Sequence, residues 1–261
     1  MKVGLIQLNA GTNKATNIIR ARSLVQKAIE AGAEFILLPE VFNYRGPLSG
    51  GELYHQIAEE IPGKSIIPFM EMAKKNTVHI LAGSIYERKL GGGKIYNTSI
   101  MIDDSGNIIG KYRKINLFKA VIDGQKIDES EIYEHGKEPV LCSIDNKKIG
   151  LSICFDLRFP ELYLNYFKEK VDLIVIPSSF SQKTGELHWK PLLRARAIEN
   201  YCYVLAPNQF GIDGNGVETY GNSMVIDPQG IVIATLEKKK EDILIIDLIF
   251  QERIFYPSVQ A

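Results

Sequence analysis

The second half of this 261-residue chain repeats the pattern of the first, and this repeat limits the fold more than any other feature of the sequence. Four segments match in the same order: Lys2-Val3-Gly4-Leu5 with Lys148-Ile149-Gly150-Leu151, the apolar run before Pro39 with that before Pro177, Ile80-Leu81-Ala82 with Val204-Leu205-Ala206, and the spaced Tyr, Ser, Asp and Gly of residues 96–106 with those of residues 220–230. Such agreement is not expected by chance. The composition shows no linker between the halves, so we predict one domain spanning residues 1–261.

The periodicity of the apolar residues predicts strands that alternate with helices. Residues 2–8 and 35–38 are expected to be strands, and residues 13–31 place their apolar side chains on one helical face. Further elements are expected as a helix at 65–75, strands at 78–82, 96–102, 107–114, 149–153 and 172–177, and helices at 161–170 and 188–200. Residues 116–138 read as a polar, irregular loop, whose length is typical of a functional or a disordered segment. We therefore predict an α/β fold, a four-layer α-β-β-α sandwich whose sheets pack face to face around a pseudo-two-fold axis.

Charge and cysteine content narrow the function classes. The 31 basic and 31 acidic residues balance, so no long-range field favours nucleic acid or a membrane surface. No apolar run approaches the roughly 20 residues of a membrane span, and the first residues read as a strand and not as a signal peptide. Three cysteines are an odd number without metal-ligand spacing, which indicates neither disulfides nor zinc. We expect a cytoplasmic protein that needs no cofactor or metal.

Cys154 is placed like a nucleophile. It follows the strand 149–153 and precedes, across the turn 155–160, the predicted helix 161–170. N–H groups at the end of a helix would favour the thiolate, which is the reactive form. A buried structural cysteine is the equally simple alternative. Cys142 and Cys202 lie in apolar, strand-like surroundings and are expected to be structural.

Two more reactive side chains follow strands in the first half. Glu40 comes directly after the strand 35–38, and Lys114 closes the strand 107–114. Ligands of parallel-sheet folds collect at the carboxyl ends of strands, so Glu40, Lys114 and Cys154 could share one pocket. Taken singly, Glu40 is typical of a solvated loop acid and Lys114 of an exposed basic cluster.

Together these three residues would complete an acyl-transfer mechanism. A cysteine that attacks a carbonyl needs a base, and a nearby carboxylate can serve. A lysine ammonium and an N–H beside the nucleophile would stabilise the tetrahedral oxyanion. The alternative base is a histidine. The four histidines are expected in a strand (His79), in exposed polar stretches (His55 and His135) and at the start of a helix (His188). Glutamate is therefore the preferred base.

Several motifs in one order resemble the nitrilase, or carbon–nitrogen hydrolase, superfamily. They are Leu38-Pro39-Glu40, Tyr112-Arg113-Lys114 with Leu117-Phe118, Cys154-Phe155-Asp156-Leu157-Arg158-Phe159-Pro160-Glu161, and His188-Trp189 followed by Leu193-Arg194-Ala195-Arg196-Ala197-Ile198-Glu199-Asn200. The similarity covers nearly the whole chain. It implies a Glu-Lys-Cys triad on an α-β-β-α sandwich, with Glu129 as a further acid that orients the lysine and helps to position the substrate. It also implies a homodimer or higher homo-oligomer.

The resemblance is greatest to amidases of the Nit branch, which act on deaminated glutathione or on ω-amides of 2-oxo acids. The expected substrate is thus a small, acidic amide that is cleaved through a thioester with release of ammonia or an amine. Arg158 lies four residues past Cys154, where its guanidinium could bind the acidic end of the substrate. The alternative is a structural ion pair of Arg158 with Asp156 or Glu161. Three aromatic residues are also expected to contact the substrate: Phe155, Tyr44 and Phe180.

Other activities stay open at this stage. They are an N-carbamoyl amidase or nitrilase, an acyltransferase that passes the acyl group to an amine, and a catalytically silent member that binds a small molecule. Two departures from the family pattern, Asn116 in place of a histidine and Lys119 in place of an aspartate, keep the silent reading open. The chain also ends at Ala261, short of the family's usual basic tail.

Overall fold

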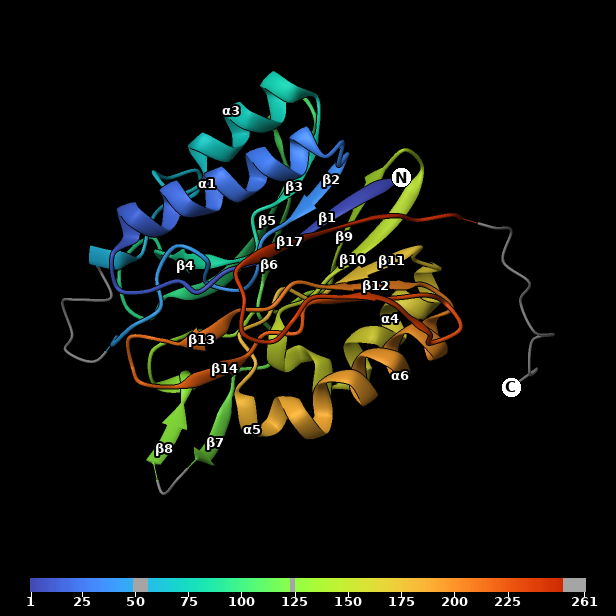
Figure 1. Cartoon of the computed structure of the whole chain (residues 1–261). Helices are drawn as coiled ribbons and strands as arrows, with labels where there is room; N and C mark the ends of the chain where they lie inside the picture. Colours follow the sequence, from blue (N-terminus) through green and yellow to red (C-terminus); the bar gives the residue numbers. More distant parts are fainter. Residues whose placement is uncertain (49–55, 123–124, 251–261) are drawn as a thin grey trace.

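The fold was obtained as a computed structural model, which describes residues 1–48, 56–122 and 125–250. Two β-sheets lie face to face in the middle of the molecule, with helices on the outside (Figure 1). The four-layer α-β-β-α sandwich predicted from the repeat is confirmed.

The first sheet is built mainly from the first half of the chain. Its strand order is β17-β1-β2-β3-β5-β4, with β6 also pairing with β5. The strands are β1 (Lys2–Gln7), β2 (Phe35–Leu37), β3 (His79–Leu81), β4 (Ile85–Glu87), β5 (Tyr96–Ile102), β6 (Ile108–Arg113) and β17 (Asp242–Asp247). Strands β1, β2 and β3 run parallel, so their carboxyl ends meet at one edge.

The second sheet repeats this order as β10-β11-β12-β15-β16, with β9 at its other edge. Its strands are β9 (Val140–Ile144), β10 (Lys147–Leu151), β11 (Leu173–Val175), β12 (Tyr203–Ala206), β15 (Met224–Ile226) and β16 (Val232–Thr235). The repeated turn is preserved as well. Gly106 N–H donates to Asp103 O at 3.0 Å, and Gly230 N–H donates to Asp227 O at 2.9 Å.

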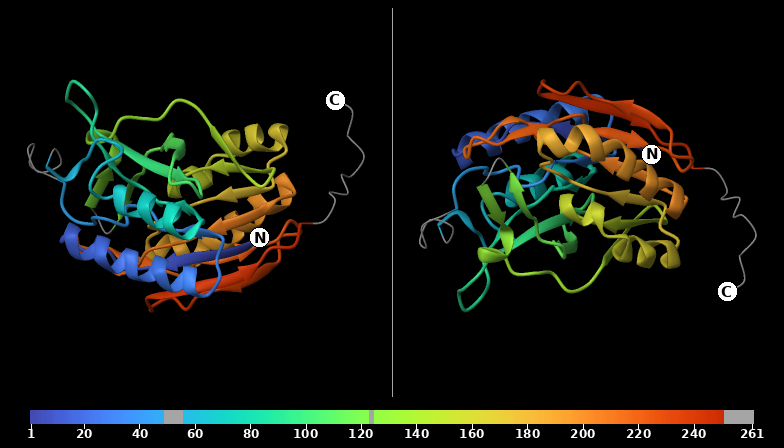
Figure 2. Two further views of the ribbon diagram at one scale, coloured as in Figure 1. Left: turned by 90° about the horizontal axis from the view of Figure 1, so that it is seen from above. Right: turned by 90° about the horizontal axis from the view of Figure 1, so that it is seen from below.

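Helices cover the outer face of each sheet. Helices α1 (Lys14–Glu30) and α3 (Ile67–Asn76) lie on the first sheet, and α4 (Pro160–Glu169) and α6 (Lys190–Asn200) lie on the second (Figures 1 and 2). Side chains alternate along β2, as a strand requires. Phe35 and Leu37 join the core that both sheets share, whereas Ile36 packs with the core beneath α1 and α3. No helix in the described ranges is long and apolar enough to cross a membrane.

Strand β17 was not predicted, and it links the two halves. It follows the last strand of the second sheet yet pairs antiparallel with β1 along all six residues of each strand, Lys2 opposite Asp247 through Gln7 opposite Asp242. The C-terminal half of the chain thus completes the sheet of the N-terminal half. The motif repeat could not indicate this pairing because it stops before residue 242.

The segment 116–138 is not irregular, and this prediction was wrong. It forms a hairpin of β7 (Lys119–Ile122) and β8 (Gln125–Asp128), followed by the short 3-10 helix η1 (Glu129–Glu131). The hairpin stands apart from both sheets (Figure 1), so it lacks the apolar alternation of a strand that covers a core. A second hairpin, β13 (Phe210–Ile212) with β14 (Glu218–Tyr220), was also not predicted.

Near the two helices predicted in the second half, the observed elements differ in detail from the predicted ones. The turn after Cys154 is a 3-10 helix, η2 (Cys154–Arg158), and the helix that follows begins at Pro160. Two short helical segments, α5 (Gln182–Thr184) and the wider turn η3 (Gly185–Trp189), precede α6. The Trp189 ring N–H donates to Asn222 O at 2.9 Å, so this residue anchors the start of α6.

Candidate active site

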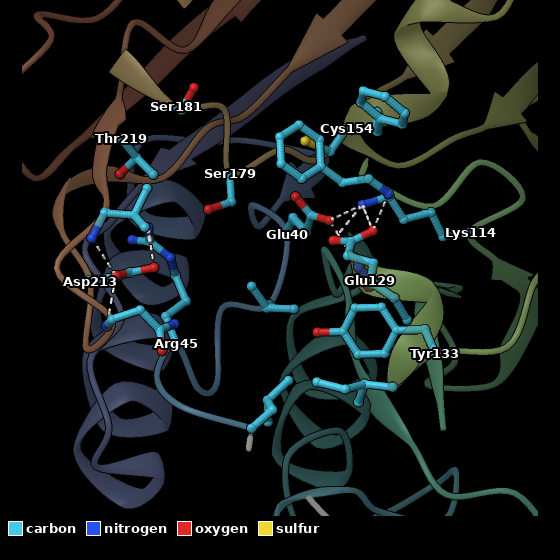
Figure 3. A pocket seen from close by; sticks show the side chains of 18 of the residues that line it. Glu40, Arg45, Lys114, Glu129, Tyr133, Cys154, Ser179, Ser181, Asp213 and Thr219 are labelled. Atoms are coloured by element: carbon cyan, nitrogen blue, oxygen red, sulfur yellow. Dashed lines mark hydrogen bonds and ion pairs between the residues drawn. The ribbon is translucent and has the colours of Figure 1, made fainter. Parts of the chain in front are cut away.

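One cavity of about 580 Å³ brings together the four side chains that the sequence singled out as catalytic. Glu40, Lys114, Glu129 and Cys154 all line it (Figure 3). They come from the carboxyl ends of β2, β6 and β10 and from the helix after the β7–β8 hairpin. The arrangement follows from the fold, because the face-to-face sheets bring the strand ends of the two halves to the same place.

Cys154 is held on a strained turn. Its φ of +45° lies in the left-handed region, which is unfavourable for a residue other than glycine. Its N–H donates to Pro177 O, just beyond β11, at 3.1 Å. The buried strands β10 and β11 therefore fix the position of the sulfur, as a nucleophile elbow requires.

The thiol form of Cys154 prevails in the free site. Burial, and next the negative charge of Glu40, raise the pKa of the Cys154 thiol well above its ordinary value, against the opposing effects of Lys114 and of the Ser179 N–H. The Ser179 N–H does favour the thiolate, in the sense expected of N–H groups beside the sulfur, but its effect on the pKa is outweighed. The physical reason is that the carboxylate beside the sulfur and the loss of water outweigh the nearby donors. The sulfur thus needs a base at the moment of attack.

Glu40 is positioned as that base. It is buried, and the side-chain amide of Asn97, on β5, donates to its Oε1 at 2.8 Å. The backbone carbonyl of Glu40 accepts from the side chain of Gln209 at 2.9 Å, a contact that reaches across from the second half. Sequence reasoning missed both supports. Asn97 could have been noticed as a polar residue inside a wholly buried strand, and Gln209 as one that follows the end of β12.

Lys114 lies between two carboxylates. Its side chain is 1% exposed, and its Nζ lies 3.0 Å from Glu40 Oε1 and 2.9 Å from Glu129 Oε2 (Figure 3). Burial alone would lower the pKa of Lys114, but Glu129 and Glu40 outweigh it and raise this pKa well above its ordinary range. The ammonium is therefore permanently charged and fixed in place, as a stabiliser of a developing oxyanion should be.

Glu129 is held by the hairpin that the sequence did not reveal. Its Oε2 accepts from the backbone N–H of Phe118 at 2.7 Å while both oxygens face Lys114. Burial raises the pKa of Glu129, Lys114 opposes this effect, and the negative charge of Glu40 adds to it. The resemblance implied that Glu129 orients the lysine, and the structure places both of its carboxylate oxygens within hydrogen-bond distance of Lys114 Nζ, at 3.1 and 2.9 Å.

The two departures from the family pattern have structural explanations. Asn116 donates from its backbone and its side chain to Asp156 Oδ1, at 2.8 and 2.9 Å. The other oxygen of Asp156 accepts from Tyr112 at 2.7 Å and from the Ile153 N–H at 3.0 Å, so this carboxylate ties β6 to the nucleophile turn. Lys119 is exposed and pairs with Asp128 across the hairpin at 3.0 Å.

Arg158 lines the same cavity, half-buried between aromatic rings. Its guanidinium carbon lies 5.2 Å from the Phe180 ring centroid and 5.7 Å from that of Phe155, and one of its nitrogens contacts His188 Nδ1 at 3.2 Å. Asp156, one of the proposed structural partners, is occupied by other donors. Both Phe155 and Phe180 line the cavity. These three residues are therefore placed where substrate contact is possible.

Tyr44 does not reach the cavity. It is buried behind the wall, its hydroxyl donates to Pro47 O at 3.1 Å, and its ring packs edge-on against Tyr86. Tyr86 and Tyr133 form that wall in its place, with their rings stacked at 5.7 Å. Tyr133 was missed because it lies in the segment that was read as a loop.

None of the histidines in the described ranges lines the cavity. His79 lies in β3, and His135 is exposed, as predicted. His188 contacts Arg158 and is one residue from the anchored Trp189. His55 lies outside the described residues, as do the last residues of the chain, on which the expectation about the tail rests. The geometry thus favours a carboxylate as the partner of Cys154.

An α-β-β-α sandwich with a cysteine, a lysine and two glutamates in one cavity defines the class of the nitrilase superfamily. The profile of the carbon-nitrogen hydrolase family matches residues 2–256, and the chain belongs to this family.

Curated relatives and solved structures agree with this assignment. A deaminated glutathione amidase of Dictyostelium discoideum is 39% identical over 258 residues, which is 95% of this chain and 87% of that protein. An omega-amidase NIT2 of Danio rerio is 36% identical over 234 residues, 89% of this chain and 83% of that protein. Among solved structures, the C. elegans NitFhit protein superimposes with a TM-score of 0.86 at 32% identity, over 94% of this chain and 60% of that one. Saccharomyces cerevisiae Nit3 gives 0.82 at 30% identity, over 94% and 89%.

Proposed function

We propose that this carbon–nitrogen hydrolase cleaves a small acidic amide through a thioester on Cys154. The chain is an amidase of the carbon–nitrogen hydrolase family, and the roles of the individual residues are our proposal. The observation that carries it is the position of Lys114, buried between Glu40 and Glu129 in the cavity that Cys154 lines. Burying three charged side chains costs desolvation free energy, and such a group is expected at a place where charge develops during a reaction.

In the first step the Cys154 sulfur attacks the amide carbonyl carbon while Glu40 takes the thiol proton. Lys114 stabilises the oxyanion, together with the N–H of Phe155, since the first N–H groups of a helix have no partner within it. Glu40 then gives its proton to the amide nitrogen, the C–N bond breaks, and ammonia or an amine leaves. The acyl group stays on the sulfur as a thioester.

In the second step Glu40 takes a proton from a water molecule, whose oxygen attacks the thioester carbon. Lys114 stabilises the second oxyanion. The C–S bond breaks, the sulfur receives the proton from Glu40, and a carboxylic acid is released. Glu129 acts through Lys114, because its two oxygens hold the ammonium beside Glu40. The loss of one oxyanion donor typically costs about 3–4 kcal/mol of transition-state stabilisation.

The relatives suggest the kind of amide. They are named for deaminated glutathione and for omega-amides, and both kinds of substrate carry a carboxylate on the acyl side. We assign that carboxylate to Arg158, because a planar guanidinium binds a carboxylate through two parallel hydrogen bonds. The partner is then a small molecule, and the intact charge cluster speaks against a silent member of the family.

The direct test is a panel of ω-amides of 2-oxo acids, deaminated glutathione, N-carbamoyl amino acids and nitriles. Release of ammonia or amine is measured for each. We expect turnover of acidic amides and little or none of the carbamoyl compounds and nitriles. Hydrolysis of nitriles alone, or no turnover of any amide by folded protein, would contradict the proposal.

The proposal also includes the location of the protein in the cell and its oligomeric state. None of the three cysteines, which all lie in the described residues, forms a disulfide, and this supports a reducing cytoplasm as the site of action. Leu164 and Phe167 on α4 are exposed, which supports a homo-oligomer. Light scattering of the purified protein measures the latter, and a monomer at working concentration would contradict it.

A further inference from the structure

Arg45 is a buried cation on the cavity wall that the mechanism does not use. Its side chain is 3% exposed. One of its nitrogens lies 3.4 Å from Asp213 Oδ2, and another lies 3.4 Å from Asn9 Oδ1. Both contacts are long. Within the part of the chain that the structure describes, the nitrogen near Asp213 has no aligned hydrogen-bond partner. A buried donor left in this state calls for an explanation.

The hydrogen bonds that shape the loop of Arg45 and the neighbouring turn are made without the guanidinium. Asp213 closes the turn between β13 and β14 with its other oxygen, which accepts from the N–H groups of Asn215 and Val217 at 2.8 and 2.9 Å. The loop of Arg45 is joined to this turn through its backbone, because Gly214 N–H donates to Arg45 O at 3.1 Å. The guanidinium nitrogen near Asp213, which has no aligned hydrogen-bond partner among the described residues, is therefore available to a ligand in the cavity.

The position of Arg45 indicates which part of a substrate it can reach. It lies five residues after Glu40, and in Figure 3 it is seen on the far side of Glu40 from Lys114. In the proposed mechanism Glu40 delivers a proton to the leaving nitrogen, so the leaving group must lie next to Glu40. A substituent on that nitrogen can then extend toward Arg45.

We propose that Arg45 binds a carboxylate on the leaving-group side of the substrate. This rests on the proposed function, in which Arg158 holds the carboxylate on the acyl side. Arg158 belongs to the turn after Cys154, whereas Arg45 belongs to the loop after β2 and contacts the β13–β14 hairpin, so the two guanidinium groups come from different elements of the wall. The preferred substrate therefore carries one carboxylate on each side of the scissile C–N bond.

This charge pattern separates the two substrate classes suggested by the relatives. Deaminated glutathione has a 2-oxo acid carboxylate on the acyl side and a glycine carboxylate on the amine side. An ω-amide of a 2-oxo acid loses ammonia and has nothing for Arg45 to bind. A cavity of about 580 Å³ also has room for a tripeptide-sized molecule. The enzyme is thus assigned to amides of the first class.

The test uses three amides of one 2-oxo dicarboxylic acid, whose leaving groups are ammonia, cysteinylglycinamide (the glycinamide amide) and cysteinylglycine (the glycine amide), so that the carboxylate stands where deaminated glutathione carries it. Formation of the common acid product gives kcat/KM for each. For the wild type we expect the glycine amide to exceed the glycinamide amide by about 30-fold or more, the size of a buried charge contact. In Arg45→Gln this ratio should fall to near one. In Arg158→Lys all three values should fall while the ratio is kept.

A second variant keeps the test decisive if Arg45→Gln does not fold. Asp213→Asn retains the oxygen that closes the turn and removes the charge that competes for Arg45, so the preference for the glycine amide should rise. An unchanged ratio in Arg45→Gln, or an unchanged or lower one in Asp213→Asn, would overturn the assignment of Arg45. Failure of the wild type to hydrolyse any of the three amides would instead contradict the proposed function.

Discussion

At the scale of single residues, the site depends on where one proton rests before the substrate arrives. The thiol of Cys154 keeps its proton because burial and the Glu40 charge oppose the thiolate. Glu40, buried and oriented by Asn97, is the group that can take this proton. The sequence indicated both residues from their places after buried strands. It could not indicate the direction of the thiol pKa, which depends on side chains from separate strands.

Glu40→Gln should therefore make the thiolate of Cys154 easier to form and yet abolish turnover. The substitution removes the negative charge and leaves Lys114 in place, so the pKa of Cys154 should fall and the thiolate should appear at lower pH than in the wild type. Steady-state hydrolysis should be lost, because no base is left to activate water. Ultraviolet absorbance of the thiolate during a pH titration measures the first effect, with Cys154→Ala as the blank. A thiol pKa that rises, or normal turnover, would contradict the role of Glu40.

The three cysteines should respond differently to replacement by alanine. Cys154→Ala should remove turnover and leave the melting temperature nearly unchanged. Cys142 and Cys202 are buried, and burial raises the pKa of Cys142 to about 11. Their alanine variants should lose about 1 kcal/mol of stability and keep kcat. Thermal unfolding and amide hydrolysis on the same samples check this, and loss of kcat in a stable Cys142→Ala or Cys202→Ala protein would contradict it.

At the scale of elements, backbone strain marks both sides of the site. Val41, directly after Glu40, has a φ of +45°, as Cys154 has. The Val41 N–H donates to Ser84 Oγ at 3.0 Å, and Gly83 beside it approaches the end of β2 closely. A Cβ on Gly83 would lie 1.9 Å from Pro39 O. The loop after β3 thus holds the residue pair Pro39-Glu40 in place.

Gly83→Ala should accordingly displace Glu40. We expect a loss of stability well above the roughly 1–2 kcal/mol of left-handed strain alone, and a large fall in kcat, because the clash is with backbone. Gly91→Ala is the matched control, since Gly91 has a φ of +87° but nothing within 4 Å of its Cβ position. Chemical denaturation and kcat are compared for the two variants. Equal effects of both would mean that contact with β2 plays no part.

The elements show where reading from sequence succeeds. Long apolar segments with a clear period, such as β5 and α1, were predicted nearly to their ends, because each covers a core. The β7–β8 hairpin was missed because it stands apart from both sheets. Glu129 nevertheless depends on this hairpin, so its buried position became visible only in the structure. Likewise, only the structure shows that Tyr133 lines the cavity and that Tyr44 does not.

At the scale of the whole molecule, β17 joins the two halves. Leu244 on this strand is opposite Leu5 of β1, and both belong to the core that the sheets share. We infer from this exchange that residues 1–261 behave as a single domain, as proposed from the absence of a linker. The motif repeat indicated two similar halves but not the strand that passes between them.

Leu244→Ala should therefore destabilise both halves together. The loss of a buried leucine side chain is expected to cost about 2–5 kcal/mol. The one tryptophan, Trp189, lies in the second half, so its fluorescence reports on that half while far-ultraviolet circular dichroism reports on both. In denaturant the two midpoints should coincide and shift equally. A tryptophan midpoint unaffected by the substitution would show that the halves unfold independently.

The central claim is that Cys154 carries the acyl group during hydrolysis. The most direct measurement is intact mass after rapid acid quenching of the enzyme with an acidic amide, followed by peptide mapping. We predict an increase equal to the acyl part of the substrate, located on Cys154 in the wild type and absent from Cys154→Ala. Two results together would contradict the claim: the wild type releases the amine without forming any adduct, and Cys154→Ala still hydrolyses the amide.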